Sequence, residues 1–257
     1  MFVEERLEEI LKILKNVGKV SVNDLSDRYK VSKDLIRKDL QKLEQKGLVQ
    51  RTYGGAILKR GENKEYFVEK RLAQNVELKN KIAEKIYNEI KEEETIFLDV
   101  SSINYLVAEK ILAKNKNIII VTNMVKILEL FTHNKVSNVK VVGVGGVLNQ
   151  HNGSFMGSMT INQIRTFKFS KAFIGVAGIN VIENQISTFG IDDGITKKAV
   201  IECSRENYIV CENNKFYTDG NYIFDSLKDI NGIITEDLQD EQLKHKIKKM
   251  DIKLVIA

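Results

Sequence analysis

The sequence contains no proline, so none of its turns depends on the fixed backbone angle of that residue. Cysteine and histidine are scarce as well. Cys203 and Cys211 stand eight residues apart without a C-x-x-C spacing, and the three histidines are scattered along the chain. This pattern predicts neither a zinc site nor a disulfide framework, and it is typical of the reducing cytoplasm. We expect no metal ion and no cofactor.

Long hydrophobic runs are also missing. The longest, at 118–121 and 141–144, are far shorter than the roughly 20 residues that a membrane span needs. The start of the sequence is acidic and amphipathic, unlike a signal peptide. We therefore predict a cytoplasmic protein without membrane contact. With 257 residues, of which 43% are hydrophobic, the chain has room for one small and one larger domain.

Positive charge is concentrated in one part of the chain. Residues 1–60 hold 14 Lys and Arg against 9 Asp and Glu, whereas residues 61–257 hold 26 of each kind. The whole net charge of +5 therefore lies within residues 1–60. A basic module beside a neutral one is the expected electrostatic pattern of a protein that binds nucleic acid phosphates.

The basic region has the pattern of a winged helix-turn-helix, and we expect this domain over residues 1–60. Residues 3–16 predict a first helix with an apolar face. Ser21 and Ser32 are predicted N-caps of a second and a third helix, and Gly47 is the predicted end of the third. Residues 50–60 then predict a wing that turns at Gly54-Gly55.

The third predicted helix has one apolar and one polar face. Its apolar stripe consists of Ile36, Leu40 and Leu43. Its polar side and first turn carry Lys33, Asp34, Arg37, Lys38 and Gln41. The first turns of a recognition helix meet base edges, where Arg binds guanine and Lys suits phosphates. The alternative is a face that is merely solvated, as polar helix faces usually are.

The same stretch resembles the N-terminal domain of DeoR-type bacterial transcription regulators. Their pattern of Ser, two variable residues, Thr-Ile-Arg-Arg-Asp-Leu and then Gly-x-x-x-Arg-x-His-Gly-Gly-Ala corresponds to Ser32, Leu35-Ile36-Arg37-Lys38-Asp39-Leu40, Gly47, Arg51 and Tyr53-Gly54-Gly55-Ala56. The departures are Leu35 for Thr, Lys38 for Arg and Tyr53 for His. The resemblance implies a double-stranded DNA operator as partner, contacted by Ser32, Lys33, Asp34, Arg37, Lys38, Gln41, Arg51 and Tyr53.

Residues 61–78 predict a charged connector, part of it a docked helix because Phe67 and Leu72 need burial. Over 79–257 helices alternate with short apolar strands. We expect helices at 79–90, 106–112, 125–131 and 195–204, and strands at 95–100, 118–123, 139–144, 171–178, 208–212, 232–235 and 253–257. This alternation predicts an α/β domain with a mostly parallel sheet. The apolar stretch 247–256 either closes that sheet or faces a neighbouring molecule.

Ligands of open parallel sheets bind beyond the carboxyl ends of the strands. The residues expected at that rim are Asp99, Ser101, Ser102, Thr122, Asn123, Gly145, Gly146, Gly175 and Lys215. Ser101 and Ser102 precede a helix, where backbone N–H groups favour an anion, and Lys215 adds positive charge. We therefore expect a small phosphorylated metabolite. Alternatively, Asp99 and Thr122 cap helices, and Gly145-Gly146 is a simple turn.

The rim also resembles the effector domain of DeoR-type regulators, which is similar to sugar-phosphate isomerases. Its motifs correspond to Asp99 to Ile103, Thr122-Asn123, Gly145-Gly146, Phe173 to Gly175 and Glu212 to Phe216. The departures from the family pattern are Ser101 for Gly, Ile103 for Thr, Glu212 for Asp and Asn214 for Ser. The resemblance implies a sugar phosphate as effector, bound at the predicted rim.

Two functions follow from these patterns. The first is a transcription regulator, a repressor of carbohydrate metabolism genes that binds its operator as a homo-dimer or homo-tetramer and responds to a phosphorylated sugar. The second is a sugar-phosphate isomerase with an accessory DNA-binding module. Its acid–base groups would come from Asp99, Asp192, Asp193 and Glu212, with Lys215 binding the phosphate. We prefer the regulator because no acidic pair is evident at the strand ends.

Overall fold

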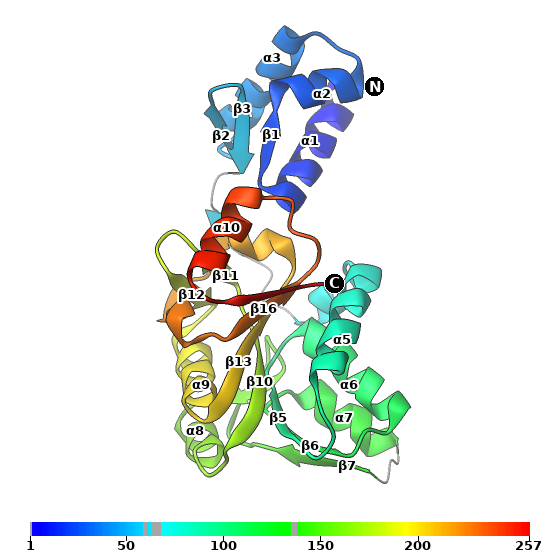
Figure 1. Ribbon diagram of the computed structural model, residues 1–257, viewed down its shortest axis with the longest axis vertical. Coiled ribbons are helices and arrows are strands. Elements are labelled where there is room, and N and C mark those ends of the chain that lie inside the picture. Colours follow the sequence, from blue (N-terminus) through cyan, green and yellow to red (C-terminus); the bar gives the residue numbers. More distant parts are fainter. Residues whose placement is uncertain (1, 59–60, 63–67, 135–137) are drawn as a thin grey trace.

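A computed structural model describes residues 2–58, 61–62, 68–134 and 138–257 (Figure 1). Figure 1 shows a small unit at one end, which we call the head, built from three helices and three strands. The larger part of the molecule, the sensor, lies below it and is built around one long sheet. Among the described residues no helix is both long and apolar enough to cross a membrane.

The three helices of the head are α1 (Val3–Val17), α2 (Val22–Tyr29) and α3 (Lys33–Gln45). The predicted caps are confirmed: the hydroxyl of Ser21 accepts from the N–H of Asp24 at 3.0 Å, and that of Ser32 accepts from the N–H of Leu35 at 3.3 Å. Gly47 follows α3 with a φ of 71°, which suits glycine. Local capping chemistry thus sets the boundaries of the helix-turn-helix.

The wing is formed by β2 (Val49–Thr52) and β3 (Gly55–Leu58), but it is not a lone ribbon. A third strand, β1 (Lys19–Ser21), pairs antiparallel with β3, so the sheet order is β1-β3-β2. A Cβ atom at Gly55 would lie 2.0 Å from the carbonyl oxygen of Val20. Glycine at this position therefore permits the pairing that joins the wing to the helices.

The head has its own core and a buried ion pair. Its core residues include Leu7, Ile10, Leu14, Leu25, Ile36, Leu40 and Leu43. The guanidinium of Arg6 on α1 donates to both carboxylate oxygens of Asp39 on α3, at 2.6 Å and 3.3 Å. Both side chains are almost completely buried. The Asp of the Arg-Lys-Asp-Leu motif therefore holds α1 against α3 and does not belong to the exposed polar face.

The sensor contains a seven-stranded sheet with the order β17-β16-β13-β10-β5-β6-β7, in which every pairing is parallel. Its strands are β5 (Thr95–Leu98), β6 (Ile118–Thr122), β7 (Val139–Gly143), β10 (Phe169–Gly175), β13 (Ser204–Val210), β16 (Gly232–Thr235) and β17 (Lys253–Ile256). The predicted parallel α/β fold is confirmed. The stretch 247–256 supplies β17, which closes one edge of the sheet.

Helices cover both faces of the sheet, and each face has a hydrophobic core. One core packs against α5 (Val76–Glu89), α6 (Ser102–Lys114) and α7 (Val125–His133). The other packs against α8 (Ser158–Ile164), α9 (Ile191–Glu202) and α10 (Glu241–Lys249). The predicted helix at 195–204 in fact begins four residues earlier, at Ile191, and the one predicted at 106–112 begins at Ser102.

Several short elements beyond the strand ends were not predicted. They are β4 (Gly61–Glu62), β8 (Val147–Asn149), β9 (Ser154–Met156), β11 (Gly178–Asn180), β12 (Gln185–Thr188), η1 (Asn213–Tyr217), β14 (Thr218–Asp219), β15 (Tyr222–Asp225) and η2 (Leu227–Asp229). The docked helix predicted within the connector is α4 (Val68–Leu72). Within the connector, Leu72 of α4 is partly buried against the α5–α7 core, whereas Phe67 lies outside the described residues.

Candidate functional site

The polar face of α3 is exposed to solvent. The predicted DNA contacts on it and at its N-cap are all exposed: Ser32, Lys33, Asp34, Arg37, Lys38 and Gln41. Arg37 donates from Nη1 to Oδ1 of Asp34 at 2.5 Å, one turn away. Both side chains are more than half exposed, and an ion pair in water contributes little. The Arg37 guanidinium can therefore leave Asp34 for a stronger acceptor.

The wing presents two further predicted contacts. Tyr53 is fully exposed at the turn between β2 and β3, next to Gly54. Arg51 is also exposed; its backbone N–H donates to Glu44 at 2.9 Å, and its guanidinium lies 3.9 Å from the same carboxylate. Because Glu44 belongs to α3, this contact fixes the wing relative to the polar helix face.

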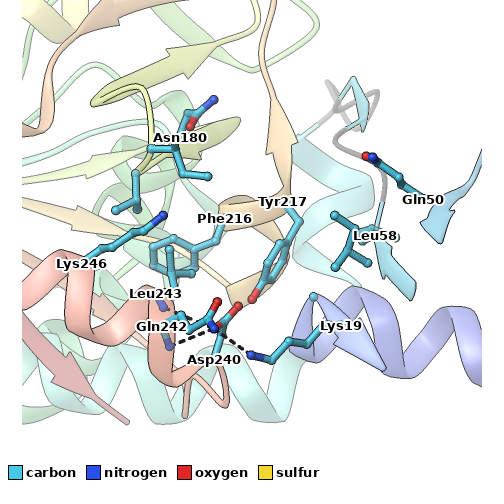
Figure 2. Close-up of a pocket in the computed structure, with 14 residues that line it drawn as sticks. Lys19, Gln50, Leu58, Asn180, Phe216, Tyr217, Asp240, Gln242, Leu243 and Lys246 are labelled. Atoms are coloured by element: carbon cyan, nitrogen blue, oxygen red, sulfur yellow. Dashed lines mark hydrogen bonds and ion pairs between the residues drawn. The ribbon is translucent and has the colours of Figure 1, made fainter. Parts of the chain in front are cut away.

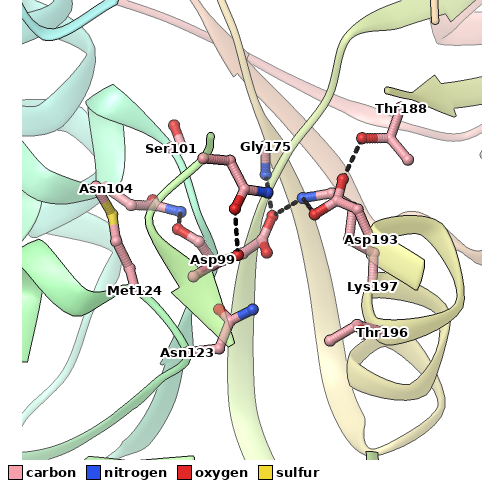
Figure 3. A network of polar contacts seen from close by, with 12 residues as sticks. Asp99, Ser101, Asn104, Asn123, Met124, Gly175, Thr188, Asp193, Thr196 and Lys197 are labelled. Atoms are coloured by element: carbon pink, nitrogen blue, oxygen red, sulfur yellow. Dashed lines mark hydrogen bonds and ion pairs between the residues drawn. The ribbon is translucent and has the colours of Figure 1, made fainter. Parts of the chain in front are cut away.

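In the sensor, a buried polar cluster lies beyond the carboxyl ends of β5 and β10 (Figure 3). The carboxylate of Asp99 accepts from the N–H of Gly175 at 2.9 Å and forms an ion pair with Lys197. The Lys197 ammonium also lies 3.6 Å from Asp193, one helical turn earlier on α9, and Asp193 accepts from the hydroxyl of Thr188. These charged side chains are at most 6% exposed.

Burial and charge compete within this cluster. Burial raises the pKa of Asp99, and Lys197 acts in the opposite direction. For Lys197 burial alone would lower the pKa, but the carboxylates of Asp193 and Asp99 raise it overall. The lysine is therefore charged, and its position is fixed without bulk water.

A small pocket beside this cluster brings two cations together. It has a volume of only about 10 Å³. Its lining includes Arg71 of α4, Lys197 and Asp193 of α9, the Gly175 end of β10 and the buried side chain of Asn152. The Arg71 guanidinium lies 5.8 Å from the ring centroid of Phe189. Lys197 was not among the predicted site residues, and Arg71 was not assigned a ligand role. The spacing of Asp193 and Lys197, four residues apart, is a sequence signal that would have pointed to the first.

The loop from Asp99 to Asn104 is held by its own side chains. The hydroxyl of Ser101 accepts from the N–H of Ile103 at 3.1 Å and caps α6, while Ser102 is buried in the first turn. The amide of Asn104 donates to the carbonyls of Asp99 and Phe173, at 2.8 Å each. The Oδ1 atom of Asn104 is buried and makes no hydrogen bond within the described residues.

The adjacent rim residues Thr122 and Asn123 differ in how far hydrogen bonds within the protein satisfy their side chains. Thr122 donates to the carbonyl of Leu98 at 2.6 Å and accepts from the N–H of Met124 at 3.1 Å, so its hydroxyl serves as a local cap. Asn123 donates to the carbonyl of Phe155 at 3.0 Å. Its Oδ1 atom, like that of Asn104, is a buried acceptor without a hydrogen bond in the described part of the chain.

Gly145 and Gly146 are tied to α8. The N–H of Gly145 donates to the side chain of Gln163 at 3.1 Å, and its carbonyl accepts from the hydroxyl of Thr160 at 2.9 Å. A Cβ atom at Gly146 would lie 2.2 Å from that same hydroxyl oxygen. The glycine pair thus permits α8 to approach the end of β7.

The last predicted motif contacts the connector. Lys215 is buried on η1. Glu212, just before η1, accepts from the amide of Asn75 at 2.6 Å and lies 3.5 Å from the ammonium of Lys79. Lys79 in turn donates to the carbonyl of Arg71 at 2.5 Å. Side chains thus connect the end of β13 to the helix that carries Arg71.

Comparison with known families and proteins covers nearly the whole chain. Residues 6–61 match the model of the DeoR-like helix-turn-helix domain, and residues 74–237 match that of the DeoR C terminal sensor domain. A lactose phosphotransferase system repressor of Streptococcus mutans is 30% identical over 251 residues, which is 96% of each chain. The glycerol-3-phosphate regulon repressor of Escherichia coli is 27% identical over 90% of each chain.

Likeness to solved structures is weaker. Ribose 5-phosphate isomerase A of Methanocaldococcus jannaschii is 14% identical and covers 56% of this chain and 55% of its own, with a TM-score of 0.40. A score of this size carries no functional argument. Among the described residues, no group of three or more His, Cys, Asp or Glu side chains is placed to hold a metal ion.

Proposed function

This chain belongs to the DeoR family of helix-turn-helix proteins, and we propose that it is a transcription repressor of sugar metabolism genes, controlled by a phosphorylated sugar. The whole-length similarity to named repressors supports this function. The exposed face of α3 carries the argument, because it presents Lys33, Arg37 and Lys38 next to a wing, as a recognition helix of the major groove does.

The proposed DNA contact uses α3 and the wing together. Arg37 would exchange Asp34 for a base edge, and Lys33 and Lys38 would neutralise phosphates. Arg51 and Tyr53 would reach the flanking backbone from the wing. We propose residues 1–60 as the DNA-binding domain, 61–78 as the connector and 79–257 as the sensor. Because operators are read as two half-sites, the working form would be a homo-dimer or homo-tetramer.

The proposed effector site lies beyond the strand ends of the sensor. Arg71 and Lys197 both line one pocket, and their N–H groups would donate to a phosphate group. Asp99 and Asp193 already balance the charge of Lys197, so Arg71 would supply the additional positive charge, and the pocket of about 10 Å³ would widen around the ligand. The buried acceptors of Asn104 and Asn123 suit sugar hydroxyl groups, which would supply the missing donors. Of the predicted rim residues, Gly175 lines this pocket directly. We propose that the others form the surrounding walls: Asp99, Ser101, Ser102, Thr122, Asn123, Gly145, Gly146 and Lys215.

A regulator is favoured over an isomerase by the state of the carboxylates. Of the four candidate acid–base groups, Asp99 and Asp193 are bound to Lys197, Glu212 is bound to the connector, and Asp192 is exposed on α9. A general base for isomerisation needs a carboxylate directed at a substrate carbon. Turnover of ribose 5-phosphate by the purified full chain would contradict this proposal and favour the enzyme.

The proposal is tested by two measurements on the full chain. The first is a melting-temperature screen against glucose 6-phosphate, fructose 6-phosphate, ribose 5-phosphate, glycerol 3-phosphate, the corresponding free sugars and inorganic phosphate. A ligand at 100 times its Kd stabilises by about 2.7 kcal/mol, which is readily seen. The second is the Kd for a DNA duplex selected from a random pool, measured with and without each compound.

We expect one sugar phosphate, and neither its free sugar nor phosphate alone, to raise the melting temperature and weaken DNA binding. Arg71→Gln should abolish that melting shift. Lys81→Gln is the matched control, because it removes a positive charge from the exposed side of α5, where Lys81 pairs with Glu77. If the random pool yields no duplex that the protein binds, the DNA-binding function is overturned. If a duplex is bound but its Kd is the same with and without every compound, the proposed control by a phosphorylated sugar is overturned.

A further inference from the structure

The segment Asn213–Asp219 contacts both parts of the molecule, and we call it the clamp segment. It consists of η1 and β14 and follows the carboxyl end of β13, beside the proposed effector site. This segment is anchored on the sensor and contacts the head at the end of α1 and the connector at β4 (Gly61–Glu62), so its position links the two parts.

On the sensor side, hydrogen bonds fix both ends of the clamp segment. The N–H of Asn213 donates to Glu236 at 2.8 Å, and its side chain accepts from Thr235 at 3.0 Å. The hydroxyl of Thr218 donates to the carbonyl of Ala177 at 2.9 Å. A Cβ atom at Gly178 would lie 2.0 Å from the carbonyl oxygen of Thr218. Ala177 and Gly178 lie two and three residues after the rim residue Gly175.

On the head side, the ring of Tyr217 lies against Gly18, where α1 ends. A Cβ atom at Gly18 would lie 2.1 Å from ring carbons of Tyr217. The next two residues, Thr218 and Asp219, pair in parallel with β4, which follows the wing. The clamp segment thus holds the head both at the end of α1 and at the exit of the wing.

The surrounding interface is incompletely packed. A cavity of about 310 Å³ lies between head and sensor, and Leu58, Phe216, Tyr217 and Leu243 are among the residues that line it (Figure 2). At its rim Lys19 of the head forms a 3.4 Å ion pair with Asp240, the N-cap of α10. Closely packed interfaces resist displacement, whereas a cavity of this size leaves room for the Tyr217 ring to shift.

A continuous set of contacts leads from the pocket to Tyr217. Arg71 lines the pocket, and its carbonyl accepts from Lys79. Lys79 pairs with Glu212 at 3.5 Å, and Glu212 directly precedes η1, which ends at Tyr217. A displacement of Arg71 by a ligand would therefore act on both the start of the clamp segment and the connector.

We propose that the clamp segment, through Tyr217 and the β14–β4 pairing, transmits effector binding at the strand ends to the orientation of the DNA-binding head. This inference rests on the proposed function. When a sugar phosphate pulls on Arg71, η1 shifts, the Tyr217 ring moves against Gly18, and the head turns relative to the sensor. The two recognition helices of an oligomer then lose their half-site spacing, and DNA binding weakens.

The first test compares two substitutions at one position in the full chain. Tyr217→Ala removes the ring, whereas Tyr217→Phe keeps the ring that contacts Gly18. Kd for the selected duplex is measured with and without each sugar phosphate of the screen. We expect the active compound to change Kd by about 5- to 150-fold in the unaltered protein and in Tyr217→Phe. In Tyr217→Ala that ratio should approach one while the ligand-induced melting shift persists. A preserved ratio in Tyr217→Ala would overturn the inference.

A matched pair of glycines provides the second test. Gly18 and Gly47 both follow a helix with positive φ, 73° and 71°. No described atom lies within 4 Å of a Cβ placed at Gly47, whereas Gly18 meets Tyr217. Both Gly18→Ala and Gly47→Ala introduce the same backbone strain. We expect only Gly18→Ala to reduce the ligand-dependent change in Kd. Equal losses would show that head strain, and not the Tyr217 contact, is responsible.

A third measurement needs no sugar. Coupling between two sites is reciprocal, so DNA binding must act on the sensor through the same segment. Amide hydrogen exchange of 213–219 is followed in the full chain with and without the selected duplex. We expect changed protection in the unaltered protein and none in Tyr217→Ala. Unchanged protection in the unaltered protein, despite tight DNA binding, would overturn the inference and leave the proposed function standing.

Discussion

The head and the sensor keep their charged functional side chains in opposite environments. On α3 the side chains of Arg37 and Asp34 are 56% and 82% exposed, although they form a 2.5 Å ion pair. In the sensor the side chains of Lys197 and Asp99 form a similarly close pair and are 3% and 2% exposed. The two ion pairs are similarly close, but they differ in exposure, and we expect them to differ in function for that reason.

The exposed pair is suited to exchange partners. Water stabilises both charges on α3, so separating them costs little, and in the proposed complex a DNA phosphate or base edge would replace the carboxylate. The buried cluster is suited to stay in place. Its charges left water when the sensor folded, and Lys197 is held in place by the carboxylates of Asp99 and Asp193. In the proposed function, the exposed pair would contact DNA, and the buried cluster would support the site of a small phosphorylated effector.

The largest effect is expected when the buried cluster loses its cation. Lys197→Met leaves two buried carboxylates without their partner and should lower the free energy of unfolding by about 3–5 kcal/mol. Asp34→Ala breaks the equally short but exposed pair and should cost about 0–1 kcal/mol. Urea denaturation of both variants measures the difference. Equal costs would mean that burial does not distinguish the two regions.

Loss of Arg37 should affect binding far more than folding. Arg37→Ala should weaken DNA binding by about 1–3 kcal/mol and relax the base preference, if the guanidinium reads a base. Because the side chain is exposed, the free energy of unfolding should change by less than about 0.5 kcal/mol. Lys12→Ala, an exposed charge on α1, is the control for net charge. An unchanged base preference would show that Arg37 reads no base.

The exposed head and the buried rim of the sensor can also be compared through one functional group, the hydroxyl of a serine N-cap. Ser32 caps α3 in the exposed head, and Ser101 caps α6 in the buried rim. Replacement of a cap by alanine costs about 0.5–2 kcal/mol. We expect Ser101→Ala to lie at the upper end, because the N–H of Ile103 is buried and water cannot replace the hydroxyl. Urea denaturation of the two variants measures the loss of unfolding free energy in each. A larger loss for Ser32→Ala than for Ser101→Ala would contradict this prediction.

The smallest effect concerns pH and is expected in the sensor. Burial raises the pKa of Glu236, which anchors the clamp segment at Asn213. The folded state therefore favours the protonated acid, so this contribution to stability is full below pH 4.5 and is lost as pH rises through the higher pKa of the folded state. Glu236→Gln should flatten that part of the stability profile, measured by urea denaturation from pH 4 to 8. Glu241→Gln, exposed on α10, should leave it unchanged.

The head could be predicted almost completely because its signals are local. Caps at Ser21 and Ser32, the apolar stripe of α3 and the glycine end all act within a few residues of sequence. The strand β1 was missed because it has three residues and exists only through its pairing with β3, more than 30 residues away. Its requirement for Gly55 becomes visible only when the two strands are side by side.

The sensor fold was predicted, and so were the rim positions of Asp99 and Gly175, but Lys197 as the partner of Asp99 was not. Asp99 and Lys197 are 98 residues apart, and no periodicity connects them. The start of α9 was missed because Gly194 lies in its first turn, where glycine is usually unfavourable. The structure supplies the reason, since a Cβ atom there would lie 2.3 Å from the ring of Tyr222. Both the Asp99–Lys197 pair and the glycine in the first turn of α9 depend on contacts between elements that are distant in the sequence.

The edge strand β17 has a consequence for biosynthesis. It completes the sheet beside β16, and its Lys253 reaches Glu89 of α5, 164 residues earlier, at 2.9 Å. The head is complete at Leu58, whereas β17 leaves the ribosome about 195 residues later, which takes roughly 10–40 s at typical synthesis rates. During each round of translation, the whole head is therefore synthesised before the domain that is proposed to control it.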